Sequence, residues 1–125
     1  MTIRRLLLAL LLLTTAALPV RAQGVTSALE DSLARLSEIL GALHYLRGIC
    51  HGSEGNRWRS EMQALVDAEG ASPDRKARMV ASFNRGYTGY QQTYRTCTPA
   101  AEIAIRRYLD EGAKLSREVT ARYSN

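Results

Sequence analysis

Apolar residues recur every three to four positions along four segments of this chain, and the strict alternation typical of β-strands is absent. The first segment carries a leucine seam with spacings of four and three: Leu29, Leu33, Leu36, Leu40 and Leu43. Ser27 and Glu30 stand at its start in the spacing of a capping box, and Gly48 and Gly52 follow its end. The pattern predicts an amphipathic helix that begins at about Ser27.

Turn signals separate three further predicted helices. The second runs from about 56 to 69, and Gly70 ends it. Its apolar face consists of Trp58, Met62 and Leu65. Ser-Pro at 72–73 and Thr-Pro at 98–99 each place a capping residue before a proline, which is typical of a helix start. The third helix has an inward stripe made of Val80, Phe83, Tyr87, Tyr90, Tyr94 and then Cys97. The fourth has one made of Ala101, Ile105, Tyr108, Gly112, Leu115, Val119 and Tyr123.

The two cysteines continue the registers of the first and third helices. Cys50 lies seven residues beyond Leu43, and Cys97 lies three beyond Tyr94. In an up-down-up-down bundle these two helices run parallel, so both cysteines reach the same end. We therefore predict an all-α fold, an antiparallel up-down-up-down four-helix bundle with one disulfide between Cys50 and Cys97. The disulfide would close a long loop, which implies a stabilisation of roughly 4 kcal/mol.

The first 22 residues have the pattern of a secretory signal peptide. Two arginines at 4–5 form a positive start, residues 6–13 are an unbroken apolar run, and the segment 20–22 offers small residues to a signal peptidase. We predict cleavage after Ala22 and a single helical domain over 23–125, located in the periplasm, where disulfides form. The apolar run is shorter than the ~20 residues that span a bilayer, so no stable membrane span is expected after cleavage.

Removal of the signal would change the charge of the protein. The full chain has 17 Lys and Arg against 12 Asp and Glu, a formal net charge of +5. Three of these arginines and none of the acids lie in the first 22 residues, so the mature chain would carry +2. Nucleic-acid binding depends on a concentrated positive charge, and most of the basic excess lies in the signal. We therefore expect no nucleic-acid partner.

The remaining charge is uneven along the predicted bundle. The end that holds the disulfide collects six arginines, which we call the basic pole: Arg47, Arg57, Arg59, Arg95, Arg106 and Arg107. His51 lies there too, against only Glu54 and Glu102. The planar guanidinium of Arg binds oxyanions bidentately, so the basic pole predicts a site for an anion or an acidic partner. The alternative is a solvated end whose arginines pair with the few acids or stack on tyrosines.

Three features of this end each have two interpretations. Arg47 falls in the inward register, where it needs a carbonyl, carboxylate or ligand as an acceptor; alternatively, Leu46 takes the inward place. Gly86 and Gly89 interrupt the third helix either for close helix packing or to let a ligand approach the backbone. The tyrosines of the third helix form either part of the core or a stacking platform for a sugar.

No catalytic or metal-binding constellation is apparent in the sequence. His44 has Gly48 at i+4 in place of a second ligand, and the segment 50–51 lacks the second cysteine of a haem attachment motif. Ser53 lies near His51 without an acid to orient it. We predict no catalytic residue, no metal site and no cofactor, and the sequence leans away from an enzyme.

Four motifs together resemble a known family: His-Tyr-Leu-Arg at 44–47, Trp-Arg at 58–59, Phe-Asn-Arg-Gly-Tyr at 83–87 and Tyr-Arg-Thr-Cys-Thr at 94–98. They are similar to a family of small exported proteins of alphaproteobacteria whose function is unknown. The resemblance covers about residues 40–123, implies a bacterial periplasmic setting and supports the pairing of the two cysteines. It implies no activity, cofactor or catalytic residue.

One main functional hypothesis and two alternatives follow. The main hypothesis is a periplasmic helical interaction or binding module that uses the basic pole to bind an envelope protein or an anionic envelope component. The first alternative is a small-molecule or metal sensor or carrier that uses the bundle core. The second is a cell-wall enzyme, for which export and basic charge are the only support. The sequence leaves the oligomeric state open.

Overall fold

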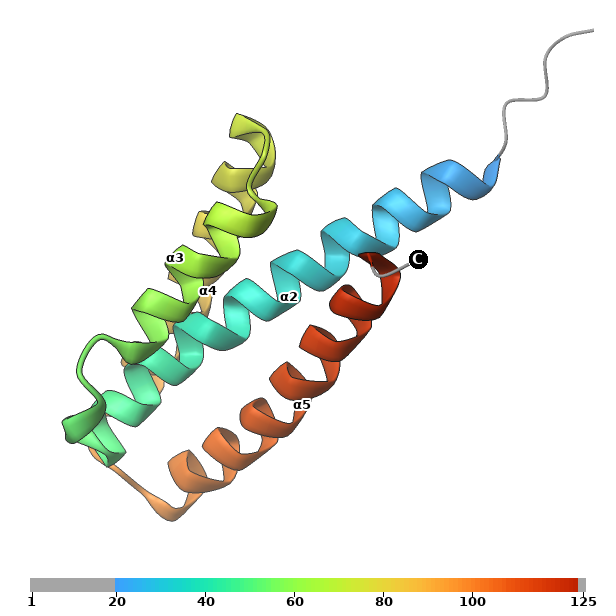
Figure 1. Cartoon of the computed structure of the whole chain (residues 1–125). Helices are drawn as coiled ribbons and strands as arrows, with labels where there is room; N and C mark the ends of the chain where they lie inside the picture. The colour runs from blue at the N-terminus through green and yellow to red at the C-terminus, as the bar shows by residue number, and fades with distance from the viewer. Residues whose placement is uncertain (1–19, 124–125) are drawn as a thin grey trace, which may run out of the picture.

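The computed structural model describes the backbone of residues 20–123 and the side chains of residues 26–122. Its elements are α2 (Val20–Cys50), the short 3₁₀ helix η2 (Gly52–Glu54), α3 (Arg57–Glu69), α4 (Pro73–Thr93) and α5 (Pro99–Tyr123) (Figure 1). Successive long helices run in opposite directions, and the described residues contain no strand. The predicted antiparallel four-helix bundle is therefore confirmed. Residues 1–19, most of the predicted signal peptide, lie outside the described part of the chain.

The helix α2 is the centre of the bundle. It contacts α3, α4 and α5, and α5 packs chiefly on it. Leu33, Ile39, Leu43 and Leu46 of α2 are almost fully buried and belong to one core cluster. Because these residues lie on more than one side of the helix, the leucine seam of the sequence is only part of the buried surface of α2. None of the described helices combines the length and the apolar character needed to cross a membrane.

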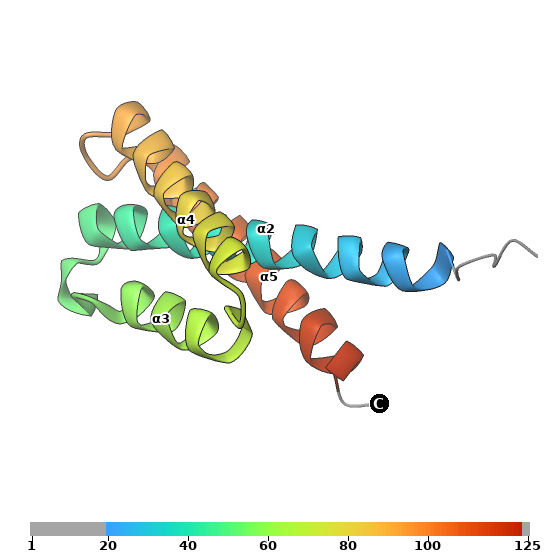
Figure 2. The same ribbon diagram turned by 90° about the horizontal axis from the view of Figure 1, so that it is seen from above.

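The helix α4 crosses α2 where a glycine of each helix meets the backbone of the other (Figure 2). A Cβ added to Gly41 would overlap the backbone of Phe83, and one added to Gly86 would overlap the carbonyl of Glu38. Such an approach requires glycine, because any side chain would hold the two backbones apart. Close helix packing is thus the reason for Gly86, one of the two interpretations of the sequence.

This crossing also corrects the predicted inward stripe of α4. The buried residues of α4 are Met79, Ser82 and Gly86, whereas Val80 is 41% exposed. The physical reason is that small residues permit the closest approach, so the helix turns its Ser82–Gly86 side toward α2. The aromatic residues of the predicted stripe lie half-buried beside the contact, and Val80 faces outward.

Two predicted helix starts are confirmed and one is wrong. The Ser72 hydroxyl accepts from the Arg75 backbone N–H at 3.2 Å, and the Thr98 hydroxyl accepts from that of Ala101 at 3.1 Å. Ser27 does not cap α2, because this helix already begins at Val20. Glu30, the second member of the predicted capping box, instead pairs with Arg75 and Arg78 of α4.

Candidate functional site

The disulfide joins the end of α2 to the connection between α4 and α5. Cys50 and Cys97 are bonded, with their Cα atoms 4.9 Å apart, as the sequence predicted. The Tyr45 hydroxyl also donates to the carbonyl of Tyr94, the first residue of this connection. The starts of α3 and α5 lie at the same end of the molecule (Figure 1). The basic pole is therefore built on a covalently closed scaffold.

Arg47 is held by a carboxylate of its own chain. It forms a bidentate pair with Glu54, with Nε 2.8 Å from Oε2, and the Trp58 indole N–H donates to the same Oε2 at 2.7 Å. The hydrogen bonds from Arg47, with help from Trp58, lower the pKa of Glu54 to about 2, and Glu54 in turn raises the pKa of Arg47. Leu46 takes the fully buried place. Each interpretation of Arg47 is thus correct in part.

The other five arginines of the basic pole are exposed and lie on different sides of the bundle. Arg57 stands over the Trp58 ring at 4.9 Å and lines a hollow between α3 and α5. Arg59 lines a groove between α3 and α4, and Arg107 lines a small hollow between α4 and α5. Arg95 is in the α4–α5 connection and Arg106 on α5. The structure spreads these arginines around the pole and does not gather them into one pocket.

Glu102 lies beside both the disulfide and His51. Its carboxylate lies 3.3 Å from His51 Nε2 and 3.5 Å from the Cys97 Sγ. Cys50, Cys97 and Glu102 form the one group of three metal-ligand types found close together in the described residues. Zinc binds the thiolate of cysteine, and both sulfurs here are consumed by the disulfide. In this oxidised state the group is suited to holding the connection in place.

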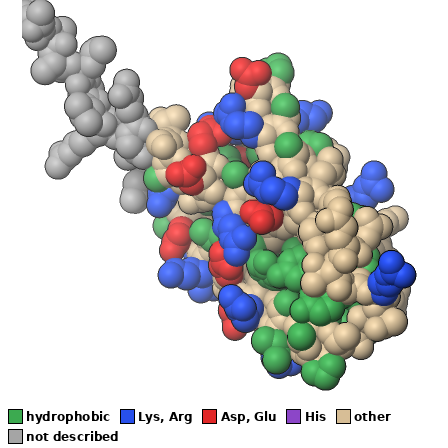
Figure 3. Space-filling view, turned by 180° about the vertical axis from the view of Figure 1, so that it is seen from behind, with side chains coloured by type: hydrophobic (Ala, Val, Ile, Leu, Met, Phe, Trp, Pro, Cys, Tyr) green, Lys and Arg blue, Asp and Glu red, His purple; other side chains and the backbone are tan. Residues whose placement is uncertain are grey.

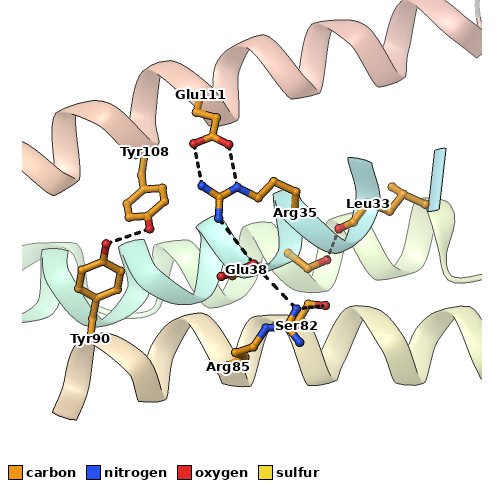
Figure 4. A network of polar contacts seen from close by, with 9 residues as sticks. Leu33, Arg35, Glu38, Ser82, Arg85, Tyr90, Tyr108 and Glu111 are labelled. Atoms are coloured by element: carbon orange, nitrogen blue, oxygen red, sulfur yellow. Dashed lines mark hydrogen bonds and ion pairs between the residues drawn. The ribbon is translucent and has the colours of Figure 1, made fainter. Parts of the chain in front are cut away.

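A polar network that the sequence analysis did not find ties α5 to α2 and α4 (Figure 4). Arg35 binds Glu111 bidentately, with N–O distances of 2.7 and 2.9 Å. Glu38 lies 3.6 Å from Arg35 and 3.8 Å from Arg85, which continues the network to α4. Basic and acidic side chains alternate along the face drawn in Figure 3. Arg35 and Glu111 lie 76 residues apart in the chain, so no local spacing could have predicted their pairing.

The tyrosines of α4 pack against the core. Tyr90 and Tyr94 are half-buried, and their rings stack with centroids 6.0 Å apart. The Tyr90 hydroxyl donates to that of Tyr108 at 2.8 Å, and burial together with this bond raises the pKa of Tyr90 (Figure 4). These contacts agree with the interpretation of the tyrosines as core residues whose hydroxyls reach the edge of the bundle.

Two hollows flank α3. The hollow between α3 and α5 has a volume of about 310 Å³, a floor of α2 leucines, and Trp58 and Tyr108 among its lining residues. With core leucines of α2 in its floor, it is a candidate place for the small molecule of the alternative sensor or carrier hypothesis. The groove between α3 and α4 has an apolar floor that includes Met62 and Phe83, with Arg59 and Lys76 also lining it.

Taken together, these features define a small all-α protein with a disulfide-closed pole and two grooves beside its central helix. The chain belongs to the family of proteins of unknown function designated DUF2385, whose pattern matches residues 28–123. The predicted membership of an uncharacterised family is thereby confirmed. No curated protein and no solved structure matches the chain.

Proposed function

We propose that the protein is a non-enzymatic binding module of the cell envelope that recognises an acidic partner through its basic pole. In this proposal the chain is exported into the periplasm of an alphaproteobacterium, and the signal peptide is cleaved after Ala22. The remaining residues then form the binding domain. The partner is an envelope protein or an anionic envelope component that presents carboxylates or phosphates.

The observation that carries the proposal is that the acids of the pole lie next to basic side chains, whereas most of its arginines have no acidic partner within the described part of the chain. Glu54 is paired with Arg47, and Glu102 lies next to His51. Among the described residues, four exposed arginines of the pole have no carboxylate within 4.0 Å: Arg59, Arg95, Arg106 and Arg107. Glu54 is thus already paired with arginine, and the positive charge of these four arginines is available to a partner.

Exposed arginines favour recognition over catalysis. Guanidinium groups bind carboxylates and phosphates bidentately without a change in their own protonation state. Because these side chains lie on different sides of the pole, they suit an extended acidic surface better than one small anion. Electrostatic attraction of this kind raises the association rate and falls with ionic strength.

The proposal is tested with labelled poly-L-glutamate as the probe and the mature, oxidised protein. We expect the triple variant Arg95→Ala, Arg106→Ala, Arg107→Ala to bind about tenfold more weakly in fluorescence anisotropy, since each exposed ion pair contributes roughly 0.5 kcal/mol. The matched control is Lys114→Ala, Arg117→Ala, Arg122→Ala, which removes three exposed cations from the later part of α5. Equal weakening by the two triple variants would reduce the effect to net charge and refute a specific role of the pole.

A further inference from the structure

We propose that the groove between α3 and α4 is the docking site for one amphipathic, acidic α-helix of a partner protein. This inference rests on the proposed function, because it assigns the acidic partner a place and a secondary structure. The groove consists of a hollow of about 180 Å³ between α3 and α4 and an adjoining, more open hollow of about 510 Å³ that α4 alone lines; the two share Lys76, Val80 and Asn84. The shared residues make the two hollows one continuous surface.

The apolar floor of the groove comes from both helices. α3 contributes Met62 and Val66, and α4 contributes Phe83. Along α4 the floor continues in an exposed stripe made of Pro73, Ala77, Val80 and Ala81. Residues at this spacing share one face of a helix, and an apolar face is normally buried.

Val80 is the clearest sign that this stripe lacks a partner within the described part of the chain. Val80 and Ile103 are the two exposed large hydrophobic residues among the described side chains, and Val80 is 41% exposed. The opposite side of α4 is already packed on α2 through Ser82 and Gly86. The helix therefore has one apolar face covered by this chain and a second face that is not.

The charges around the groove specify the sign of the partner. Arg59 and Lys76 both line it, whereas no Asp or Glu is among the residues that line either hollow. Asn84 supplies a neutral hydrogen-bonding group, and Gln63 donates to the Asp67 carboxylate at 2.8 Å, so the one described acid bonded to a lining residue is already engaged. A partner that presents apolar side chains flanked by carboxylates complements this arrangement, and a basic partner would be repelled.

The shape of the groove favours a helix over the other occupants. The residues of α4 that line the groove extend from Pro73 to Asn84, which is about 17 Å of helix, or roughly three turns. Helices pack into such grooves with apolar anchors spaced at i, i+3, i+4 and i+7. The described chain offers no strand whose edge could pair with an extended peptide. The groove is also open along its length, unlike the enclosed pockets that hold small molecules.

The test uses a synthetic peptide of about 15 residues that forms a helix with leucines on one face and glutamates beside them. A peptide of the same composition, scrambled so that no apolar face remains, is the reference probe. We expect the ordered peptide to bind at least tenfold more tightly than the scrambled one. Amide chemical-shift changes on binding should concentrate at residues 59–66 and 76–84.

The variant Lys76→Glu, Val80→Asp should weaken the ordered peptide at least tenfold. Its matched control, Ile103→Asp with Lys114→Glu, changes the other exposed large apolar residue and another exposed cation on α5. Both positions in the groove variant are exposed, so we expect its helicity and its thermal midpoint to match those of the wild type. Circular dichroism checks this expectation directly.

The outcomes separate this inference from the proposed function. Equal binding of the ordered and scrambled peptides, or no saturable binding of the ordered one, would overturn the docking site. The docking site would also be overturned if anionic phospholipid vesicles bound through Lys76 and Val80 and the peptide did not bind. If the groove variant binds normally and the pole triple variant loses poly-L-glutamate, the groove is wrong and the proposed function stands. If instead the groove variant loses the peptide and the pole triple variant binds poly-L-glutamate normally, the docking site stands and the role of the pole is refuted.

Discussion

At the scale of single residues, the buried polar side chains of the described part of the chain have hydrogen-bond partners with one exception. Arg47, Glu54 and Trp58 satisfy one another beside the disulfide, and the Ser37 hydroxyl donates to the Leu33 carbonyl at 2.7 Å. His44 is the exception among the described side chains, because its Nδ1 is buried without a hydrogen-bond partner. An imidazole in this position is suited to the neutral form, in which one ring nitrogen carries no proton.

The environment of His44 leads to a prediction about pH. Burial between the rings of Phe83 and Tyr87, and then the positive charge of Arg59, lower the pKa of His44 below 6.5. The unfolded chain therefore binds the proton more readily than the folded one. Stability should be full above pH 6.5 and should fall as the pH drops below it, by at most about 1.4 kcal/mol per pH unit.

Urea denaturation at pH 8 and at pH 5.5 measures this effect. The variant His44→Leu should remove most of the loss between the two pH values, because leucine does not titrate. The control is His51→Gln, which replaces an exposed histidine and should leave the dependence in place. A wild-type protein that is equally stable at both pH values would contradict the prediction.

At the scale of the elements, the contact between α2 and α4 determines how the third helix of the bundle is oriented. Gly41 and Gly86 meet the opposite backbones, and Ser82 is buried between the two helices. Because of this contact, Val80 faces outward, whereas packing through the apolar stripe would have buried it in the core. The exposed face proposed as a docking site is thus a consequence of the glycine crossing.

Two glycines of the same helix should respond oppositely to alanine. Gly86→Ala should destabilise the protein by about 3 kcal/mol or more, because the new methyl group would overlap the Glu38 backbone and force the helices apart. Gly89→Ala should stabilise it by about 0.5–1 kcal/mol, because no atom lies within 4 Å and alanine favours the helix. Chemical denaturation of the three proteins measures both values. Similar effects of the two substitutions would show that the crossing is looser than described.

Much at this scale could be predicted from local patterns. The Ser-Pro and Thr-Pro starts, the leucine seam and the parallel registers of Cys50 and Cys97 each depend on residues a few positions apart. The orientation of α4 could not be predicted, because a stripe of apolar residues does not reveal that a smaller face will pack more closely. The predicted start of α2 was wrong because Ser27 and Glu30 have the spacing of a capping box. The helix already begins at Val20, so the N–H groups near Ser27 need no cap.

The candidate site was predictable only in part, for a physical reason. Register and topology place the arginines near one end of the bundle, and that information is local. Whether an arginine meets a carboxylate depends on tertiary contacts, as Arg75 and Glu30 outside the pole illustrate with a separation of 45 residues. The groove between α3 and α4 also depends on how two helices are set against a third. Exposed arginines could therefore be identified, but their distribution around the pole could not.

At the scale of the whole molecule, α2 is a central support with α3 and α4 on one part of its surface and α5 on another (Figures 1 and 2). Two connections fix α5 on this support. The disulfide holds its start, and the bidentate pair of Arg35 and Glu111 holds it further along α5. The relative position of the basic residues on α3 and α5 therefore depends on the covalent bond at the pole.

Loss of the disulfide should act on the whole molecule. Cys50→Ser and Cys97→Ser should each destabilise the protein by roughly 4 kcal/mol, because each removes the same restriction on the unfolded chain. The double variant should lose no more than either single variant, since one bond is removed in all three cases. Urea denaturation of the oxidised protein measures these losses, and dithiothreitol should reproduce them in the wild type and leave the double variant unchanged. Losses that add in the double variant would mean that each cysteine contributes separately, and the closed pole would then not be the source of the stability.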